Sequence, residues 1–261
     1  MNPTPIDDSQ SWQLLADELD CWRALDRTPT LWWRDDDAEQ DSEALQRLCR
    51  LSREFAIPLS LAVIPAGADE SLRPLFQFTP RLQALQHGYS HQNHAPASKR
   101  KCELGDDRPL SDIMEQLSRG RVRLTQLLGQ AFVPALVPPW NRLSEALVDQ
   151  LQSQDFVGLS TLGPRQAEVA SGLRLNHVHI DLINWREGRC FAGDAQVLGQ
   201  LINHLRQRRL AEVDPQEATG LMSHHLAHDE GCWDFLERLF GFLDDQPVRW
   251  LTGAELFNPA G

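Results

Sequence analysis

Apolar and polar positions follow two periods along this chain. Short apolar runs predict about eight strands, at 30–34, 58–64, 82–86, 132–137, 156–161, 175–181, 219–224 and 248–251. Leucine-rich faces at helical spacing predict helices at 10–25, 41–54, 110–129, 143–153, 195–209 and 231–244. Strands that alternate with helices are typical of β/α units, and about eight such strands favour a closed barrel over an open sheet.

Polar residues indicate where some of these elements begin and where the chain loops. Asp41-Ser42 and Ser111-Asp112 stand where N-caps belong. The polar segment 92–109 has neither period and follows a histidine cluster, so we expect a long loop over the mouth of an active site. No internal repeat or linker is visible, and we expect a single domain over 1–261, with its motifs at about 30–252.

Composition limits the partners and the compartment. The chain has 261 residues and a net charge of -12, which repels nucleic acids and anionic membranes, although acidity also serves solubility. No apolar stretch approaches the length of a membrane span, and acidic residues near the start argue against a signal peptide, so we expect a cytoplasmic protein. The five cysteines form no CxxC pair, which is typical of reduced thiols.

The first cluster of candidate chemistry is Arg34-Asp35-Asp36-Asp37, directly after the apolar Leu31-Trp32-Trp33. Barrel enzymes collect their catalytic groups at the carboxyl ends of strands. Adjacent carboxylates repel one another there unless a cation or an arginine compensates the charge. We therefore expect a metal ion at this strand end; a solvated loop with helix-capping aspartates is the alternative.

The second cluster is His87-Gly88-Tyr89-Ser90-His91. A spacing of four residues brings two imidazoles together on a helical turn, and neutral imidazole binds zinc and other borderline metals. Two histidines joined to an aspartate from another strand form a facial site with open positions for water and substrate. A histidine pair without that aspartate has a purely structural reading.

The third cluster is Val137-Pro138-Pro139-Trp140-Asn141-Arg142. Two consecutive prolines stiffen the chain and remove donors, which leaves the amide of Trp140 free to face an oxyanion. A rigid strand exit is the alternative reading.

Two histidine-rich clusters follow later in the chain. Strand alternation puts His177, His179 and Asp181 on one face, which would need a polar cavity. His224 and His225 end an apolar strand, a position suited to general acid catalysis near neutral pH. Either cluster has an alternative reading as a satisfied core network, which we favour for His228-Asp229.

In this order the five clusters resemble the five motifs of the polysaccharide deacetylase family (NodB-homology, carbohydrate esterase type), from about Leu31 to Leu251. The resemblance implies a distorted (β/α) barrel of seven or eight strands. It also implies an enzyme that removes acetyl groups, commonly N-acetyl groups of amino sugars, by metal-assisted hydrolysis.

The first family motif, TFDDG, is similar to Arg34-Asp35-Asp36-Asp37-Ala38. This match implies that Asp36 is the general base and Asp37 a metal ligand. A shift of one position would instead make Asp35 the base and Asp36 the ligand.

The second family motif, H-[ST]-x-x-H, resembles His87 to His91 and implies that these two histidines are the remaining ligands. Gly88 stands where the family has a hydroxyl residue, and Gln92 stands where it has a proline. We expect these two changes to affect support of the ligands more than ligation itself.

The third family motif, R-x-P-Y-G, is similar to the segment that begins at Val137. Val137 occupies the position of the arginine that orients the catalytic aspartate, so we expect Arg34 or Arg142 to replace it. Trp140 would donate its amide to the oxyanion.

The last two family motifs match less completely. D-x-x-D-W resembles Asp181 to Trp185, with Asn184 in place of the second aspartate and Trp185 as a pocket wall. L-x-H resembles Met222-Ser223-His224 and implies His224 as the general acid, with His225 as the substitute candidate.

We therefore expect one divalent metal ion, zinc first, and a small-molecule or oligosaccharide substrate bearing an N- or O-acetyl group. Trp33, Trp140, Trp185 and Tyr89 offer flat faces to sugar rings or belong to the core. Two alternatives stay open: a metal-dependent amidohydrolase that acts on a small non-sugar amide, and a catalytically inactive sugar-binding barrel.

Overall fold

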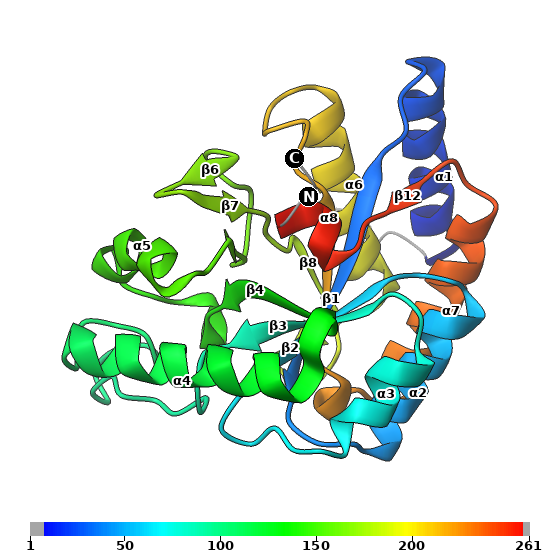
Figure 1. Ribbon diagram of the computed structural model, residues 1–261. Helices are drawn as coiled ribbons and strands as arrows, with labels where there is room; N and C mark the ends of the chain where they lie inside the picture. Colours follow the sequence, from blue (N-terminus) through cyan, green and yellow to red (C-terminus); the bar gives the residue numbers. More distant parts are fainter. Residues whose placement is uncertain (1–7, 258–261) are drawn as a thin grey trace.

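The computed structural model describes residues 8–257 and contains a mostly parallel central sheet (Figure 1). Strands β1 (Thr30–Ala38), β2 (Leu59–Val63), β3 (Leu82–His87), β4 (Phe132–Val137) and β5 (Gly158–Leu159) pair with one another in chain order. On its other side β1 pairs in parallel with β11 (Thr219–Ser223). The short β12 (Arg249–Trp250) pairs in parallel with the start of β1 on the edge opposite β11. The parallel order confirms the predicted β/α architecture.

The segment 173–181 joins the two edges of this sheet. Its first part, β7 (Leu173–Leu175), pairs in parallel with β5, and its last part, β8 (Ile180–Asp181), pairs in parallel with β11. Between them the amide of Val178 donates to Thr161 O at 3.0 Å, and the amide of His179 donates to Gly220 O at 2.8 Å. The sheet therefore closes into a distorted barrel, as predicted.

Two short antiparallel pairings lie outside this barrel. Strand β6 (Val169–Ala170) pairs with β7, and β9 (Ile183–Asn184) pairs with β10 (Cys190–Phe191).

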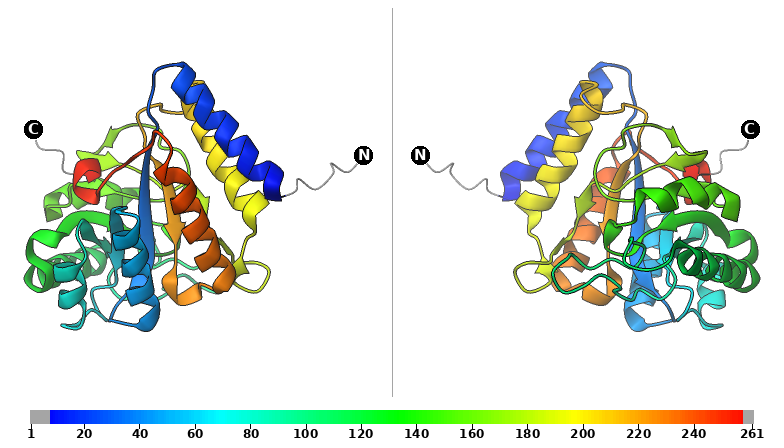
Figure 2. Two further views of the ribbon diagram at one scale, coloured as in Figure 1. Left: turned by 90° about the vertical axis from the view of Figure 1, so that its right-hand side faces the viewer. Right: turned by 90° about the vertical axis from the view of Figure 1, so that its left-hand side faces the viewer.

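Helices cover the outside of the sheet, and the longer ones match the predicted segments. They are α1 (Asp8–Ala24), α2 (Glu43–Glu54), α4 (Leu110–Leu128), α5 (Glu145–Leu151), α6 (Asp194–Arg209) and α7 (Glu230–Asp244). The sequence did not reveal α3 (Leu72–Phe78) and α8 (Gly253–Phe257), which are too short to show a helical period. Figure 2 shows α1 alongside α6, where Arg209 Nε donates to Glu18 Oε1 at 2.7 Å.

Helix starts agree with the sequence in one of two predicted places. The Ser42 side chain accepts a hydrogen bond from Leu45 N and caps α2, as expected. The expected cap at Ser111-Asp112 is wrong, because Pro109 precedes the first residue of α4 and no side chain caps that helix. Proline has its φ fixed near the helical value, which makes it a suitable entry to a helix without a side-chain cap.

Alternation along β1 separates two apolar layers. Trp32 lies in a buried cluster with residues of the other barrel strands, among them Leu85, Val137 and Met222, which fill the barrel interior. Trp33, pointing the other way, packs against the surrounding helices, and its ring lies 4.8 Å from that of Phe240. Side chains that continue the Trp32 face of β1 therefore reach the mouth of the barrel.

None of the helices in residues 8–257 combines the length and the apolar character that a bilayer span requires.

Candidate metal and active site

A bulge at the end of β1 positions its carboxylates. Between Asp35 and Ala38, β1 advances by three residues while its partner β2 advances by two, and Asp37 adopts φ 71°. An extra residue of this kind turns its side chain out of the strand alternation. Asp36 and Asp37 therefore both reach the barrel mouth, although they are neighbours in the chain.

Asp37, His87 and His91 come together at this mouth. Oδ1 of Asp37 lies 3.1 Å from His87 Nε2 and 3.3 Å from His91 Nε2, and the three donor atoms lie within 4.8 Å of one another. His87 Nδ1 lies 2.9 Å from Val137 O and donates its proton to that carbonyl, which leaves the Nε2 lone pair facing Asp37. This is the tautomer that a histidine adopts as a metal ligand, so the three residues fit a divalent cation.

The ionisation of Asp37 and His91 agrees with this reading. Burial alone would raise the pKa of Asp37, but hydrogen bonding to His87 and the nearby imidazoles lower it well below its usual range. Burial and the neighbouring His87 lower the pKa of His91. Burial opposes a charge on His87, yet Asp37 and Asp36 raise its pKa. Asp37 is thus an anion and His91 a neutral donor, as metal ligation requires.

Arg34 and Asp36 form a buried ion pair beside this group. Arg34 Nε lies 2.8 Å from Asp36 Oδ1, and a terminal guanidinium nitrogen donates to Asp36 Oδ2 at 2.9 Å. The same guanidinium donates to Ser160 Oγ at 2.7 Å and to Asn141 Oδ1 at 2.9 Å. Its side chain is fully buried, so the arginine holds the Asp36 carboxylate from two directions.

The other candidate arginine lies elsewhere. Arg142 donates to the carbonyl of Lys101 at 2.8 Å, in the loop 92–109, and has no contact of this kind with Asp36. Val137, at the position of the family arginine, is fully buried in the barrel interior. Of the two expected substitutes, the structure brings Arg34 to the aspartate.

Asp35 points to the opposite face of β1 and pairs with His225. Its Oδ1 accepts from His225 Nδ1 at 2.5 Å, and its Oδ2 accepts from Ser223 Oγ at 2.6 Å and from His225 N at 3.0 Å. Burial alone would raise the pKa of Asp35, but His225 lowers it; burial alone would lower the pKa of His225, but Asp35 raises it. Because these bonds occupy both residues, the geometry does not favour Asp35 as the base or His225 as the acid.

His224 lies at the open side of the site. Its Nε2 is 3.9 Å from Asp36 Oδ2, and its ring packs edge-on against Trp185 at 4.7 Å. Trp185 is 42% exposed, and its Nε1 donates to Asp181 Oδ2 at 2.8 Å. Burial raises the pKa of Asp181, although His224 opposes this. Asn184 is turned away, since its Oδ1 accepts the amides of its own turn.

Trp140 reaches the site through a sharp turn. Trp140 and Asn141 both have φ 55°, so the chain reverses after the two prolines. The Trp140 ring consequently lies 4.4 Å from that of His91, and the Asn141 side chain meets Arg34.

The expectation that His177, His179 and Asp181 share one polar cavity is wrong. Regular pairing stops at Leu175 and resumes at Ile180, so alternation does not hold between them. His179 lies with His204 and Glu217 in a buried group, and Asp181 lies beside His224.

This second group has the composition of a metal site but a different protonation. His179 Nδ1 accepts the amide of Gly220 at 3.0 Å, so in the neutral ring the proton lies on Nε2, which is 3.4 Å from Glu217 Oε2. Burial and Arg208 lower the pKa of His179 to about 3, and burial and His179 lower that of His204 to about 2. A nitrogen that carries a proton cannot bind a cation, so we assign this group to the core.

The expected satisfied core network at His228-Asp229 is wrong, because Asp229 is exposed and the His228 ring nitrogens have no hydrogen-bond partner among the described residues. Asp229 caps α7 by accepting from Cys232 N. Both ring nitrogens of His228 are buried without a hydrogen-bond partner among residues 8–257, and its ring packs against Trp233 at 4.4 Å.

Two residues at the site were not expected from the sequence. Ser160 binds Arg34, and the fully buried Glu103, in the predicted loop 92–109, binds the amides of the His87–His91 segment. The apolar neighbours Cys102 and Leu104 interrupt that polar loop and were the available signal for burial.

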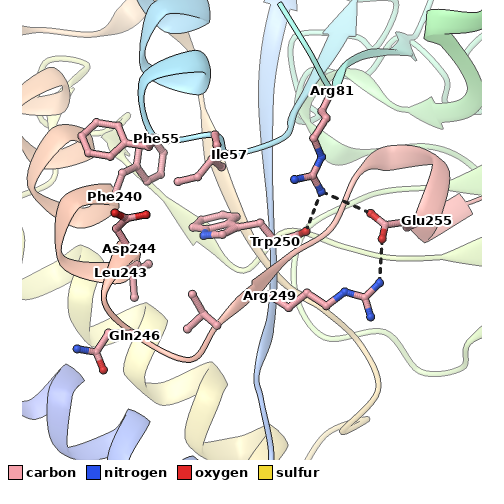
Figure 3. A pocket seen from close by; sticks show the side chains of 12 residues that line it. Phe55, Ile57, Arg81, Phe240, Leu243, Asp244, Gln246, Arg249, Trp250 and Glu255 are labelled. Carbon is pink, nitrogen blue, oxygen red and sulfur yellow. Dashed lines mark hydrogen bonds and ion pairs between the residues drawn. The ribbon is translucent and has the colours of Figure 1, made fainter.

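Two hollows in the structure differ in where they lie relative to the candidate site. One, of about 330 Å³, is lined by Phe55, Phe240 and Trp250 (Figure 3). Trp250 pairs with Leu31 at the start of β1, so this hollow lies at the end of the barrel away from the site. Its Arg249 binds Glu255 at 2.8 Å, so these charges are paired within it. Another hollow, of about 410 Å³, is lined by Asp181 and Trp185 and therefore adjoins the candidate site.

No protein-family model matches this chain, and no curated protein matches it. Solved structures, however, do match this chain. A putative polysaccharide deacetylase from Mycobacterium smegmatis superposes with a TM-score of 0.59 at 17% identity, over 87% of this chain and 88% of that chain. The chain has the fold of the polysaccharide deacetylases.

Two further structures agree with this assignment of the fold. A family 4 carbohydrate esterase from Streptomyces lividans in complex with acetate has a TM-score of 0.52 at 11% identity, covering 85% of this chain and 91% of that chain. A family 4 acetyl xylan esterase from Clostridium thermocellum, in complex with a cobalt ion, has a TM-score of 0.52 at 13% identity, covering 87% and 90%. At such identities the likeness establishes the fold of the deacetylases and carbohydrate esterases, as the motifs predicted.

Proposed function

We propose that this protein is a metal-dependent hydrolase that removes an acetyl group from an N- or O-acetylated carbohydrate. The observation that carries the proposal is the convergence of Asp37, His87 and His91 beside the Arg34–Asp36 ion pair. The likeness in fold to structures described as deacetylases and acetyl esterases supports the acetyl substrate.

Asp37, His87 and His91 would hold the metal ion, with zinc as the first candidate. When bound, the ion supplies Lewis-acid chemistry to water and to the acetyl carbonyl. The cobalt ion named in the acetyl xylan esterase structure supports a metal ion in this fold.

Asp36 would act as the general base and take a proton from the attacking water. Its carboxylate is almost fully buried and is held by Arg34, so it is fixed in orientation before substrate arrives. Ser160 and Asn141 fix the guanidinium in turn. The amide of Trp140 would donate to the oxygen that becomes negative when the acetyl carbonyl is attacked.

His224 would protonate the departing amine or alcohol. Its Nε2 lies 3.9 Å from Asp36 Oδ2, and it has no hydrogen bond to a carboxylate of the kind that occupies His225. The role of acid therefore fits His224 better than His225.

The aromatic residues at the rim suit a sugar ring. Trp185 is 42% exposed and lines the hollow of about 410 Å³, and the ring of Trp140 lies against that of His91. These flat walls favour a carbohydrate over a small aliphatic amide. The Arg34–Asp36 pair argues against the inactive sugar-binding alternative, because β1, the strand of Asp36 itself, supplies the orienting arginine that β4 lacks at Val137.

The test is acetate release from a panel of acetylated sugars and acetylated non-sugar amines. We expect His87→Ala and His91→Ala to lose activity. His94→Ala is a matched control, because His94 lies in the same region but hydrogen-bonds Arg108 instead of Asp37. Activity on the non-sugar amines alone would replace the carbohydrate assignment, and a fully active His87→Ala variant would refute the mechanism.

A further inference from the structure

We propose that Glu103 is a positioning residue for the metal-binding segment 87–91, and that Gly88 makes room for it. The inference rests on the proposed function only in taking His87 and His91 as metal ligands. Glu103 comes from the long loop 92–109 and is fully buried.

The Glu103 carboxylate binds the backbone between the two histidines. Its Oε1 accepts from Ser90 N at 2.8 Å and from Ser90 Oγ at 3.1 Å, and both of its oxygens lie 3.3 Å from Tyr89 N. Carboxylates that receive several such donors fix a loop more firmly than neutral acceptors do.

The carbonyls of the same segment are held from the other side. Gln86 Nε2 donates to Gly88 O at 3.0 Å, and Ala66 N donates to Tyr89 O at 2.9 Å. Hydrogen bonds to both its donors and its acceptors therefore hold the segment in its present conformation. That conformation ends with His91 at φ 54°, a left-handed value unfavourable for a side chain with a Cβ, and it directs Nε2 to Asp37.

Gly88 is required by the approach of Glu103. A Cβ at position 88 would lie 2.2 Å from Glu103 Oε2 and 2.7 Å from Pro139 Cδ, and the φ of Gly88 is +52°. The hydroxyl residue of the family motif therefore cannot occur here together with Glu103.

The negative charge of Glu103 favours metal binding, as its hydrogen bonds do. Among residues 8–257 no lysine or arginine forms an ion pair with it within 4.0 Å. A buried carboxylate near the donor group favours a cation there. Changes to residues that hold metal ligands typically weaken metal affinity by about 10–100-fold.

The experiment measures zinc affinity by competition with a chromophoric chelator for Glu103→Gln and Glu103→Ala. We expect the affinity to fall by about 10–100-fold, with Asp106→Asn unchanged. Asp106 is a suitable control because it is an exposed carboxylate of the same loop. Wild-type affinity in both Glu103 variants would overturn the proposal.

A coupled substitution tests the role of Gly88. Gly88→Ala should weaken zinc binding more in the wild-type background than in Glu103→Ala, where the colliding oxygen is absent. Strictly additive effects would contradict the proposed fit between the two residues.

A second readout needs neither metal nor substrate. Amide hydrogen exchange at Tyr89 and Ser90 should accelerate in the metal-free Glu103→Gln protein, while exchange in α7 stays unchanged and reports an intact fold. Unchanged exchange at both amides would refute positioning. A wild-type protein that binds zinc but releases no acetate would refute the proposed function and leave this inference intact.

Discussion

Replacing Arg34 by methionine tests the most unusual feature of the site. Methionine keeps the length and apolar stem of the side chain but removes the guanidinium from Asp36, Ser160 and Asn141. Asp36 then remains as a buried carboxylate without its partner, a change that typically destabilises a protein by about 3–5 kcal/mol. The loss of an oriented base should also lower kcat by about 10²–10⁴-fold.

The assays are urea unfolding and acetate release under saturating metal. Arg142→Met is the matched control, because Arg142 donates to the Lys101 carbonyl and not to Asp36. We expect the unfolding free energy of this variant to stay within about 0.5 kcal/mol of that of the wild type. Adding Val137→Arg to Arg34→Met should recover part of the activity, since position 137 lies on the inner barrel face. An Arg34→Met protein with wild-type stability and kcat would refute the reasoning.

Three further predictions concern buried histidines and the rim. Burial lowers the pKa of His204 to about 2, so below pH 6.5 the unfolded chain takes up a proton that the folded protein does not. The free energy of unfolding therefore falls by about 1.4 kcal/mol for each unit by which the pH is lowered. His204→Gln should remove this contribution, and parallel plots of unfolding free energy against pH for the variant and the wild type would contradict it. The Asp35–His225 pair should instead lose stability as the pH rises above neutrality. The pKa of Asp35 is lowered and that of His225 is raised in the folded protein, so the pair stabilises the fold fully between about pH 3.8 and 6.5. This stabilisation is lost as the pH rises through the pKa of His225 in the folded protein. The difference in unfolding free energy between wild type and Asp35→Asn should therefore shrink at high pH, and a constant difference from pH 5 to 9 would count against the pair. Trp185→Leu should raise KM for an acetylated sugar by about fivefold while Trp185→Phe changes it less, and equal values for the two variants would exclude a stacking role.

Much of the barrel could be predicted because its strands and longer helices each show a regular pattern of apolar residues. The apolar runs of the barrel strands report burial on both faces, and the leucine faces of the longer helices report burial of one face. The segment 173–181 was harder, since it pairs with two different strands and breaks its alternation at His177 and His179.

The roles within Asp35-Asp36-Asp37 could not be separated by sequence, because three adjacent carboxylates look alike in any pattern. Alternation explains why Arg34 and Asp36 share a face opposite Asp35, but the bulge that turns Asp37 to the same mouth depends on pairing with β2. Similarly, Glu103 and Ser160 act through contacts with residues far away in the chain, which no local pattern reports.

The central claim is that Asp37, His87 and His91 hold one metal ion. Elemental analysis of protein purified without chelators tests it most directly. We predict close to one equivalent of a divalent metal in the wild type and in His94→Ala, and almost none in Asp37→Ala, His87→Ala or His91→Ala. Folded wild-type protein that retains no metal after equilibration with excess zinc, or a full equivalent in the three alanine variants, would contradict it.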